Sequence, residues 1–184
     1  MRMQSMAVAL ATLSLAWIPL QVGAHDGEIH EESELTPAAR RDLAALRAAT
    51  ARYHDFDLAT TGGGWTVTVP FPPAEPECMV DTEGAYDGGM GYHFLNPLNV
   101  GSTDPSRPAA LIYEPEKDGT MRLVGIEFIS GGLEGDTPPV LFGQSFEWNS
   151  RFAVWTLHVW TWRYNPNGLF AAWNPMVSCE HAFL

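Results

Sequence analysis

The chain has 184 residues, with 22 Asp and Glu residues against 10 Lys and Arg residues and a formal net charge of −12. A chain of this length is expected to fold as one domain. A surface this acidic repels nucleic acid and anionic lipid headgroups, which argues against polyanion-binding functions, and we expect no nucleic-acid partner.

The first 24 residues have the pattern of a secretory signal peptide. Arg2 is followed by an apolar run over residues 6–20 and then by VGA at residues 22–24, a small-x-small cleavage pattern. The apolar run is shorter than a membrane span requires. We therefore expect residues 1–24 to be removed, no membrane span to remain, and a secreted or periplasmic location; an uncleaved N-terminal anchor is the alternative.

A flexible segment and a helix are predicted next. Residues 25–35 (HDGEIHEESEL) are acidic and almost free of core residues. Thr36 and Pro37 then have the pattern of an N-cap followed by proline at the first helical position. The periodicity predicts a helix from about Pro37 to about His54, before the flexible break TTGGG at residues 60–64. The apolar face of this helix is formed by Ala39, Leu43, Leu46, Thr50 and Tyr53.

From Trp65 onward the sequence has the pattern of β-strands. Its clearest hairpin joins ALIY (110–113) to MRLVGIEFI (121–129) through a turn at Asp118-Gly119. Further strands are predicted at residues 65–71, near residue 78, and at residues 91–96, 140–148 and 152–164. Residues 36–184 are therefore predicted to form a single domain that is mainly β (α+β), with one N-terminal helix followed by an antiparallel β-barrel or sandwich.

Cys78 and Cys179 are the two cysteines of the chain. In an exported protein an even pair indicates a disulfide, which would tie the early β segment to the C-terminal region. The alternative is a metal–thiolate pair, but the chain has no Cys-x-x-Cys spacing to support it.

Three titratable residues lie inside apolar strand patterns: His93, Glu127 and His158. Such groups need partners when they are buried. Two imidazoles and one carboxylate on three strands would form a metal site with open positions, suited to Zn, Fe(II), Mn or Cu as a divalent transition-metal cofactor. Two alternatives remain open. The first is core hydrogen bonding, with Glu127 accepting from Arg122, Arg163 or a Trp indole, and the second is an acid–base pair in a ligand pocket.

Aromatic residues beside these groups are predicted to bind a ligand. Strand alternation places Trp160 and Trp162 on the same face as His158, and Tyr92 is adjacent to His93. A pocket lined by Trp and Tyr with a few polar groups is typical of small-ligand sites. We therefore predict that Tyr92, Trp160 and Trp162 line the pocket.

Two further histidine clusters have weaker patterns. Cleavage after Ala24 would leave His25 as an N-terminal residue able to chelate copper together with His30. His54, Asp55 and Asp57 resemble a ligand cluster, but a helix C-terminus followed by a turn is the favoured interpretation.

Three sequence segments stand out when they are taken together: GGMGYHFLNP (88–97), ALIYEP (110–115) and LHVWTWRYNPNGLFAAWNPMVSC (157–179). Together they resemble a group of small exported bacterial proteins of unknown function. The resemblance extends from about Ala51 to Cys179 and implies a secreted single domain. It implies no activity, ligand or catalytic residue.

The function predicted from these features is that of an exported small-ligand or metal-binding accessory protein, whose partner is a small ligand or another protein. No Gly-x-Ser-x-Gly or Walker pattern is present, so enzymatic activity is left open and a non-enzymatic role is favoured. One alternative is a metal-dependent or acid/base enzyme using His93, Glu127 and His158 in a β-barrel pocket. The other is an envelope structural or interaction protein that self-associates through exposed aromatic residues, which an exposed apolar patch would favour.

Overall fold

The computed structural model describes residues 34–69, 75–81 and 88–182. The predicted signal peptide and the predicted flexible segment up to residue 33 lie outside the described residues. Among the described residues, no helix combines the length and apolarity that crossing a membrane requires.

The predicted N-terminal helix is confirmed. Helix α2 (Pro37–Thr50) continues into a 3₁₀ turn, η1 (Ala51–His54). The side chain of Thr36 accepts a hydrogen bond from the backbone N–H of Ala39 at 3.1 Å, and Pro37 opens the first turn, so the N-cap prediction also holds. The face predicted to be apolar is the buried one, comprising Ala39, Leu43, Leu46, Thr50 and Tyr53.

The predicted flexible break overlaps a short π-helical turn, η2 (Leu58–Gly62). The carboxylate of Asp55 accepts from the backbone N–H of Leu58 at 3.0 Å at its start. A Cβ on Gly63 would lie only 2.8 Å from the Tyr53 ring and from the Ala59 carbonyl oxygen. Gly63 therefore allows close packing against η1 and η2, which the break prediction missed.

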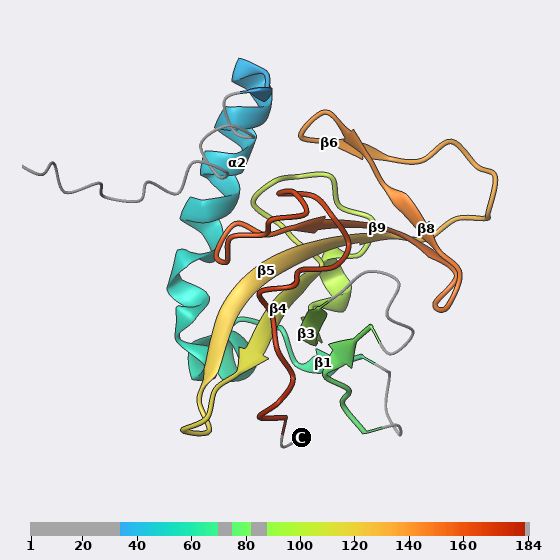
Figure 1. Cartoon of the computed structure of the whole chain (residues 1–184). Coiled ribbons are helices and arrows are strands. Elements are labelled where there is room, and N and C mark those ends of the chain that lie inside the picture. The colour runs from blue at the N-terminus through green and yellow to red at the C-terminus, as the bar shows by residue number, and fades with distance from the viewer. Residues whose placement is uncertain (1–33, 70–74, 82–87, 183–184) are drawn as a thin grey trace, which may run out of the picture.

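The strands form one seven-stranded antiparallel sheet in the order β1–β3–β4–β5–β9–β8, with β2 also paired to β3 (Figure 1). A separate two-stranded sheet pairs β6 with β7. The strand bounds are β1 Val67–Thr68, β2 Met79–Val80, β3 Gly89–Leu95, β4 Ala110–Pro115, β5 Met121–Ser130, β6 Val140–Leu141, β7 Gln144–Ser145, β8 Glu147–Asn149 and β9 Val154–Val159. A 3₁₀ turn, η3 (Pro97–Asn99), follows β3.

The mainly β class with one N-terminal helix is thus confirmed, and so is the hairpin of β4 and β5. The strand order is an open path, so a closed barrel is not among the described pairings, and the choice between barrel and sandwich stays a prediction.

Three predicted strands have different bounds in the structure. The strand predicted at residues 65–71 is reduced to β1 in its described part. The strand predicted at residues 140–148 is three short strands, because Phe142 and Gly143 have φ of 56° and 77° and form a turn. The strand predicted at residues 152–164 ends at Val159, because the backbone N–H of Trp160 donates to the Leu169 carbonyl of the C-terminal segment.

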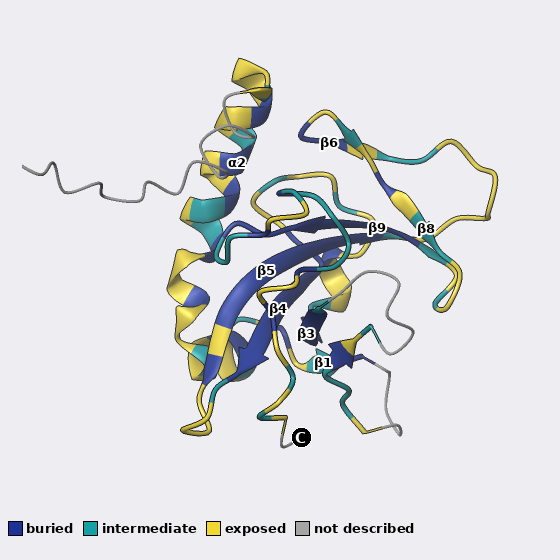
Figure 2. Cartoon of the chain, viewed as in Figure 1, coloured by how far each residue is buried: buried dark blue, intermediate teal, exposed yellow. Residues whose placement is uncertain are grey.

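The central strands are buried on both faces. β4 is buried along its whole length and β5 over most of its length, as the dark blue ribbons in Figure 2 show. One face, here the helix face, packs Tyr92, Phe94, Leu111 and Phe128 against α2. The opposite face, here the C-terminal face, is covered by residues 172–179, which cross in front of β5 in Figure 1. Burial on both faces explains why these strands read as nearly continuous apolar runs.

Asn-Pro turns fix the path of the C-terminal segment. The side-chain oxygens of Asn96, Asn165 and Asn174 each accept from the backbone N–H two residues further on, the Asx-turn pattern. Two of these turns also lock to each other, since the amide of Asn165 donates to the Trp173 carbonyl and that of Asn174 donates to the Tyr164 carbonyl. The segment is therefore held in one conformation although it has little regular secondary structure.

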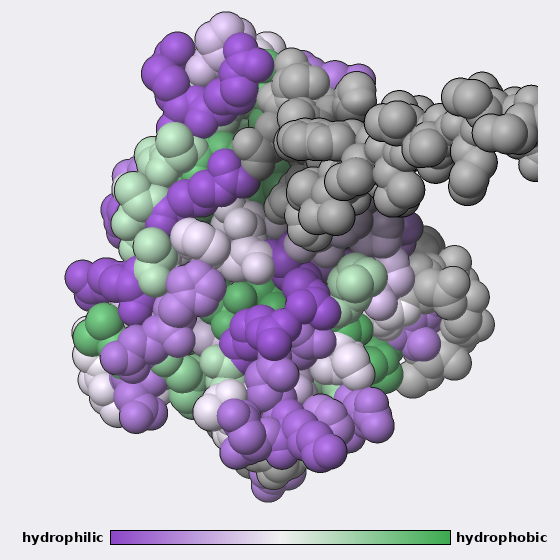
Figure 3. Space-filling model, turned by 60° about the vertical axis from the view of Figure 1, so that its left-hand side comes forward, coloured by the Kyte–Doolittle hydropathy of each residue, from purple (hydrophilic) through white to green (hydrophobic). Residues whose placement is uncertain are grey.

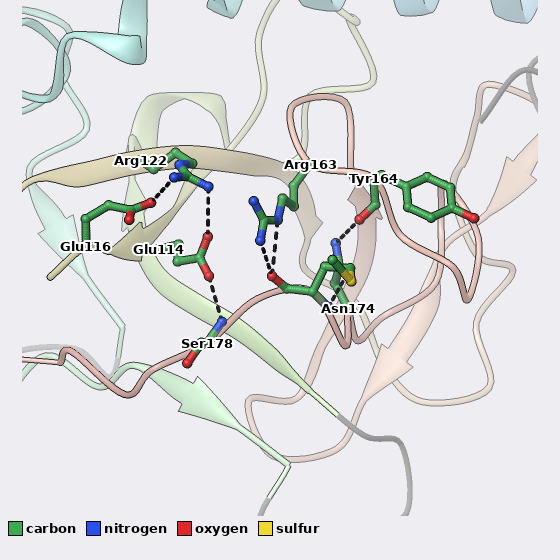
Figure 4. Close-up of polar contacts among 8 residues, drawn as sticks. Glu114, Glu116, Arg122, Arg163, Tyr164, Asn174 and Ser178 are labelled. Carbon is green, nitrogen blue, oxygen red and sulfur yellow. Dashed lines mark hydrogen bonds and ion pairs between the residues drawn. The ribbon is translucent and has the colours of Figure 1, made fainter. Parts of the chain in front are cut away.

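Polar contacts and the disulfide join this segment to the sheet. Figure 4 shows Arg163 donating to the segment's backbone, at the Met176 carbonyl, and the backbone N–H of Ser178 donating to Glu114. The predicted Cys78–Cys179 disulfide is confirmed, with the two Cα atoms 5.8 Å apart.

Candidate metal centre

His93, Glu127 and His158 meet on the C-terminal face of the sheet. The Nε2 atom of His93 lies 3.7 Å from Oε2 of Glu127, and Nε2 of His158 lies 3.6 Å from Oε1 of the same carboxylate. One ligand atom from each residue can be chosen so that all three lie within 4.8 Å of one another. In the described part of the chain, this is the one group of three or more His, Cys, Asp or Glu residues with such geometry.

Strand register brings the three side chains together. Glu127 on β5 pairs directly with His158 on β9, so the two side chains share a face. His93 lies on β3, two strands away from β5, a distance of about 9 to 10 Å. Ala110 on the intervening β4 pairs with Glu127 and also with Leu95. Because Ala110 has only a methyl group, the Glu127 side chain can extend across β4 toward His93.

A second small residue makes room beside His158. A Cβ on Gly125 would lie 2.9 Å from the indole ring of Trp160. Trp160 lies nearly parallel to the His158 ring, with the planes 15° apart and the centroids separated by 6.1 Å. Its indole N–H donates to the Ala171 carbonyl at 2.6 Å, which ties the ring that flanks His158 to the C-terminal segment.

Burial holds all three groups in their neutral forms. The side chains of His93, Glu127 and His158 are 3–7% exposed. Desolvation raises the pKa of Glu127 to about 8. Desolvation also lowers the pKa of His93 to about 4, against a smaller opposing effect of the Gly91 backbone, and lowers that of His158 to about 3, with a further contribution from His93. At neutral pH the metal-free site therefore contains a protonated carboxyl and two neutral imidazoles.

One ring nitrogen of the site, Nε2 of His158, is fully buried and has no hydrogen-bond partner among the described residues. Buried unpaired nitrogens are costly and are rare in folded proteins. The cationic partners considered for Glu127 lie elsewhere, since Arg122 pairs with Glu116 at 2.6 Å and with Glu114 at 3.8 Å, while Arg163 binds a backbone carbonyl. The ion pairs of Arg122 are visible in Figure 4.

The donor set fits a first-row transition metal. Neutral imidazole and carboxylate are ligands of Zn, Fe, Mn and Cu, and two His with one carboxylate leave positions open for other ligands. Two atoms bound to one ion at about 2.1 Å each lie at most about 4.2 Å apart. The separations of 3.6 and 3.7 Å, one to each oxygen of the carboxylate, already satisfy this limit, and no separation within the chosen group of three atoms exceeds 4.8 Å.

A cavity of about 130 Å³ adjoins the site. His93, Glu127 and Thr156 are three of its polar lining residues, and Asn149 is the fourth. The other lining residues are apolar: Val69, Met79, Met90, Leu95, Val100, Ile129, Phe152 and Val154. His158 instead borders a smaller pocket with Gln144, Ser145 and Glu147. Small molecules can therefore approach the cluster through the cavity at His93 and Glu127.

The three aromatic residues predicted to bind a ligand are placed differently from one another. Trp160 lies beside His158 on the predicted face, but it is not among the residues that line the cavity. The prediction that Trp162 shares this face is wrong, because β9 ends at Val159 and Trp162 packs on the helix side, where its indole donates to Thr50 at 3.2 Å. Tyr92 is 1% exposed in the helix-side core, so it does not line the cavity beside His93.

Among the described residues, the cluster of His54, Asp55 and Asp57 adds no ligand to this site. His54 packs edge-on against Trp162 at the end of η1, and Asp55 caps the following turn, in agreement with the favoured helix-end interpretation. His25 and His30 lie outside the described residues. Ala110, Gly125 and the cavity lining were not predicted, and the role of Ala110 depends on strand register.

Comparisons of this chain with protein-family models, with curated proteins and with solved structures find no match.

Proposed function

We propose that this protein binds one divalent transition-metal ion through His93, Glu127 and His158 and exposes it to the adjoining cavity. The observation that carries the proposal is the convergence of three buried ligand groups, together with the His158 Nε2 atom, which is buried without a hydrogen-bond partner among the described residues. A core hydrogen-bond role would leave this nitrogen unpaired. A metal ion would use the His158 nitrogen directly and would fix the tautomer of His93.

The residues of this chain would bind the metal ion and orient its ligands. His93 and His158 are already neutral, as metal ligation requires, and Glu127 would lose its proton on binding. A bound metal with open positions supplies Lewis acidity to whatever molecule reaches it. Metal binding and presentation is therefore the primary role proposed here, and catalysis would be an addition to it.

An exported location is part of the same proposal. The Cys78–Cys179 disulfide is consistent with an oxidising compartment. The envelope-interaction alternative requires a large exposed apolar patch. On the side of the molecule shown in Figure 3, hydrophilic residues dominate and apolar residues form separate patches, so that side offers no support for this alternative.

The test is a titration of tag-free purified protein with Zn(II), Co(II), Mn(II) and, under anaerobic conditions, Fe(II). We expect one ion per chain for at least one of these metals, and no binding at this site in the folded variant carrying His93→Ala and His158→Ala. A metal site formed by His25 and His30 would survive in that variant. Equal binding by the two proteins, or no binding by the wild type, contradicts the proposal.

The pH dependence of binding gives a sharper expectation. The pKa of Glu127 is about 8 and those of the histidines are about 4 and 3, so only one proton competes with the metal between about pH 5 and 8. The apparent Kd should therefore fall about tenfold for each pH unit up to pH 8 and then level off. Ordinary, exposed ligands would instead give constant affinity above pH 6.5 and a steeper, two-proton loss below it.

A site that titrates near pH 8 but retains no metal would favour the acid–base alternative. In that case Glu127 would act as a general acid toward a molecule in the cavity. A carboxyl signal with an apparent pKa near 8 in metal-free protein, together with failure of every metal titration, is the result that would support it.

A further inference from the structure

We propose that the cavity beside the metal centre binds a compact, mainly apolar molecule that carries one oxygen donor, and that this oxygen ligates the metal. The part of this inference that concerns the oxygen donor rests on the proposed metal centre. The part that concerns the apolar portion of the ligand rests on the shape and lining of the cavity alone.

The size of the cavity limits the ligand. A volume of about 130 Å³ is close to that of an apolar protein cavity of about 150 Å³ known to accept benzene. The ligand should therefore have about six to eight non-hydrogen atoms. A nucleotide, a sugar chain or a peptide is too large.

The lining determines the chemistry of the ligand. Eight of the twelve lining residues are apolar, and the polar four are His93, Glu127, Asn149 and Thr156. No Lys or Arg lines the cavity in the described part of the chain. An anionic or strongly polar oxygen would therefore find no cation except a metal held at His93 and Glu127, and the rest of the ligand would be surrounded by aliphatic, aromatic and thioether groups.

The positions of the exposed and the polar lining residues determine how a ligand is oriented in the cavity. Val100 is 43% exposed, whereas the other lining residues are buried or half-buried, so the cavity meets solvent beside Val100. His93 and Glu127 are deeply buried members of the same lining. A ligand therefore enters past Val100 with its oxygen donor pointing toward the carboxylate and its apolar part held by residues such as Ile129 and Phe152.

Two probes separate the apolar contribution from the metal contribution. Benzene has no donor, and phenol has the same ring with one oxygen. Their Kd values are measured by ¹H–¹⁵N chemical-shift titration of metal-free protein and of protein loaded with Zn(II), with retained metal quantified separately. We expect benzene to bind both forms with equal affinity, and phenol to bind the loaded form at least about tenfold more tightly than the metal-free form.

A substitution at the entrance tests the location. Val100→Trp should weaken both probes at least about tenfold by filling the entrance, and because the residue is exposed the variant should fold. Leu98→Trp is the matched control, since Leu98 is 85% exposed and does not line the cavity, and it should change neither Kd by more than about twofold.

The outcomes distinguish the two proposals. If neither probe binds, or if Val100→Trp has no effect, the cavity inference is overturned. If the loaded protein binds benzene and phenol equally, the oxygen-donor part is overturned while the retained metal still supports the metal centre. If no metal is retained, the proposed function fails, and benzene binding blocked by Val100→Trp would still support the apolar part.

Discussion

Replacing Glu127 with Gln is expected to weaken binding of Zn(II) at least about 100-fold while leaving the metal-free protein folded. Gln has nearly the same shape as the protonated carboxyl, and burial keeps that carboxyl protonated below about pH 8. The substitution therefore removes the one charged ligand without changing the charge of the metal-free core. Altering groups that only support ligands costs about 10- to 100-fold in metal affinity, so losing a ligand should cost at least as much.

The same variant should change how stability depends on pH. The pKa of Glu127 is raised from 4.5 to about 8, so folded wild-type protein holds a proton that the unfolded chain releases above pH 4.5. The contribution of Glu127 to stability is therefore fully present below pH 4.5 and is lost as pH rises through 8. Gln cannot titrate, so in the absence of metal the Gln variant should gain stability relative to wild type across this range in urea unfolding.

Glu114→Gln is the matched control for both measurements. Glu114 is also a buried carboxylate, 6% exposed, but it pairs with Arg122 and accepts from the Ser178 backbone outside the cluster. We expect this variant to bind metal with wild-type affinity. If Glu127→Gln and Glu114→Gln bind metal equally well, Glu127 is not a ligand.

Replacing Cys78 with Ser is expected to lower the free energy of unfolding by about 4 to 5 kcal/mol. The disulfide spans 101 residues, so opening it releases a long loop in the unfolded chain. Urea denaturation under non-reducing conditions measures the change. Cys179→Ser and the double variant should show the same loss, because each of them removes the same cross-link.

Loss of the disulfide should affect the C-terminal segment first. The backbone pair of Gly89 and Asn174 and the Ser178–Glu114 hydrogen bond would still hold this segment against the sheet. The metal centre lies on the strands under the segment, so its affinity should fall much less than the stability. A stability loss below about 1 kcal/mol would contradict the stabilising role of the bridge.

Much of the fold could be predicted from sequence patterns that span only a few residues. The helix at Pro37 was predicted because its cap and its buried spacing lie within a few residues of each other in sequence. The β4–β5 hairpin was predicted for the same reason, since Asp118-Gly119 specifies the turn. The end of β9 was not predicted, because it depends on a hydrogen bond from Trp160 to Leu169, nine residues later.

The site was predictable as a set of residues but not as a geometry. His93, Glu127 and His158 stand out as titratable groups in apolar strands. Their convergence depends on β4 placing the small Ala110 between β3 and β5, and on the register that sets Glu127 opposite His158. Trp162 was assigned to the wrong face because alternation was extended past the end of the strand.

The most direct test of the metal centre is anomalous X-ray diffraction from crystals of the protein loaded with Zn(II), with data collected on both sides of the zinc absorption edge. The proposal predicts an anomalous peak about 2.0 to 2.2 Å from Nε2 of His93, Nε2 of His158 and a carboxylate oxygen of Glu127. No peak among these three side chains, or a peak only at other residues, would contradict it and would return the cluster to a role within the hydrophobic core.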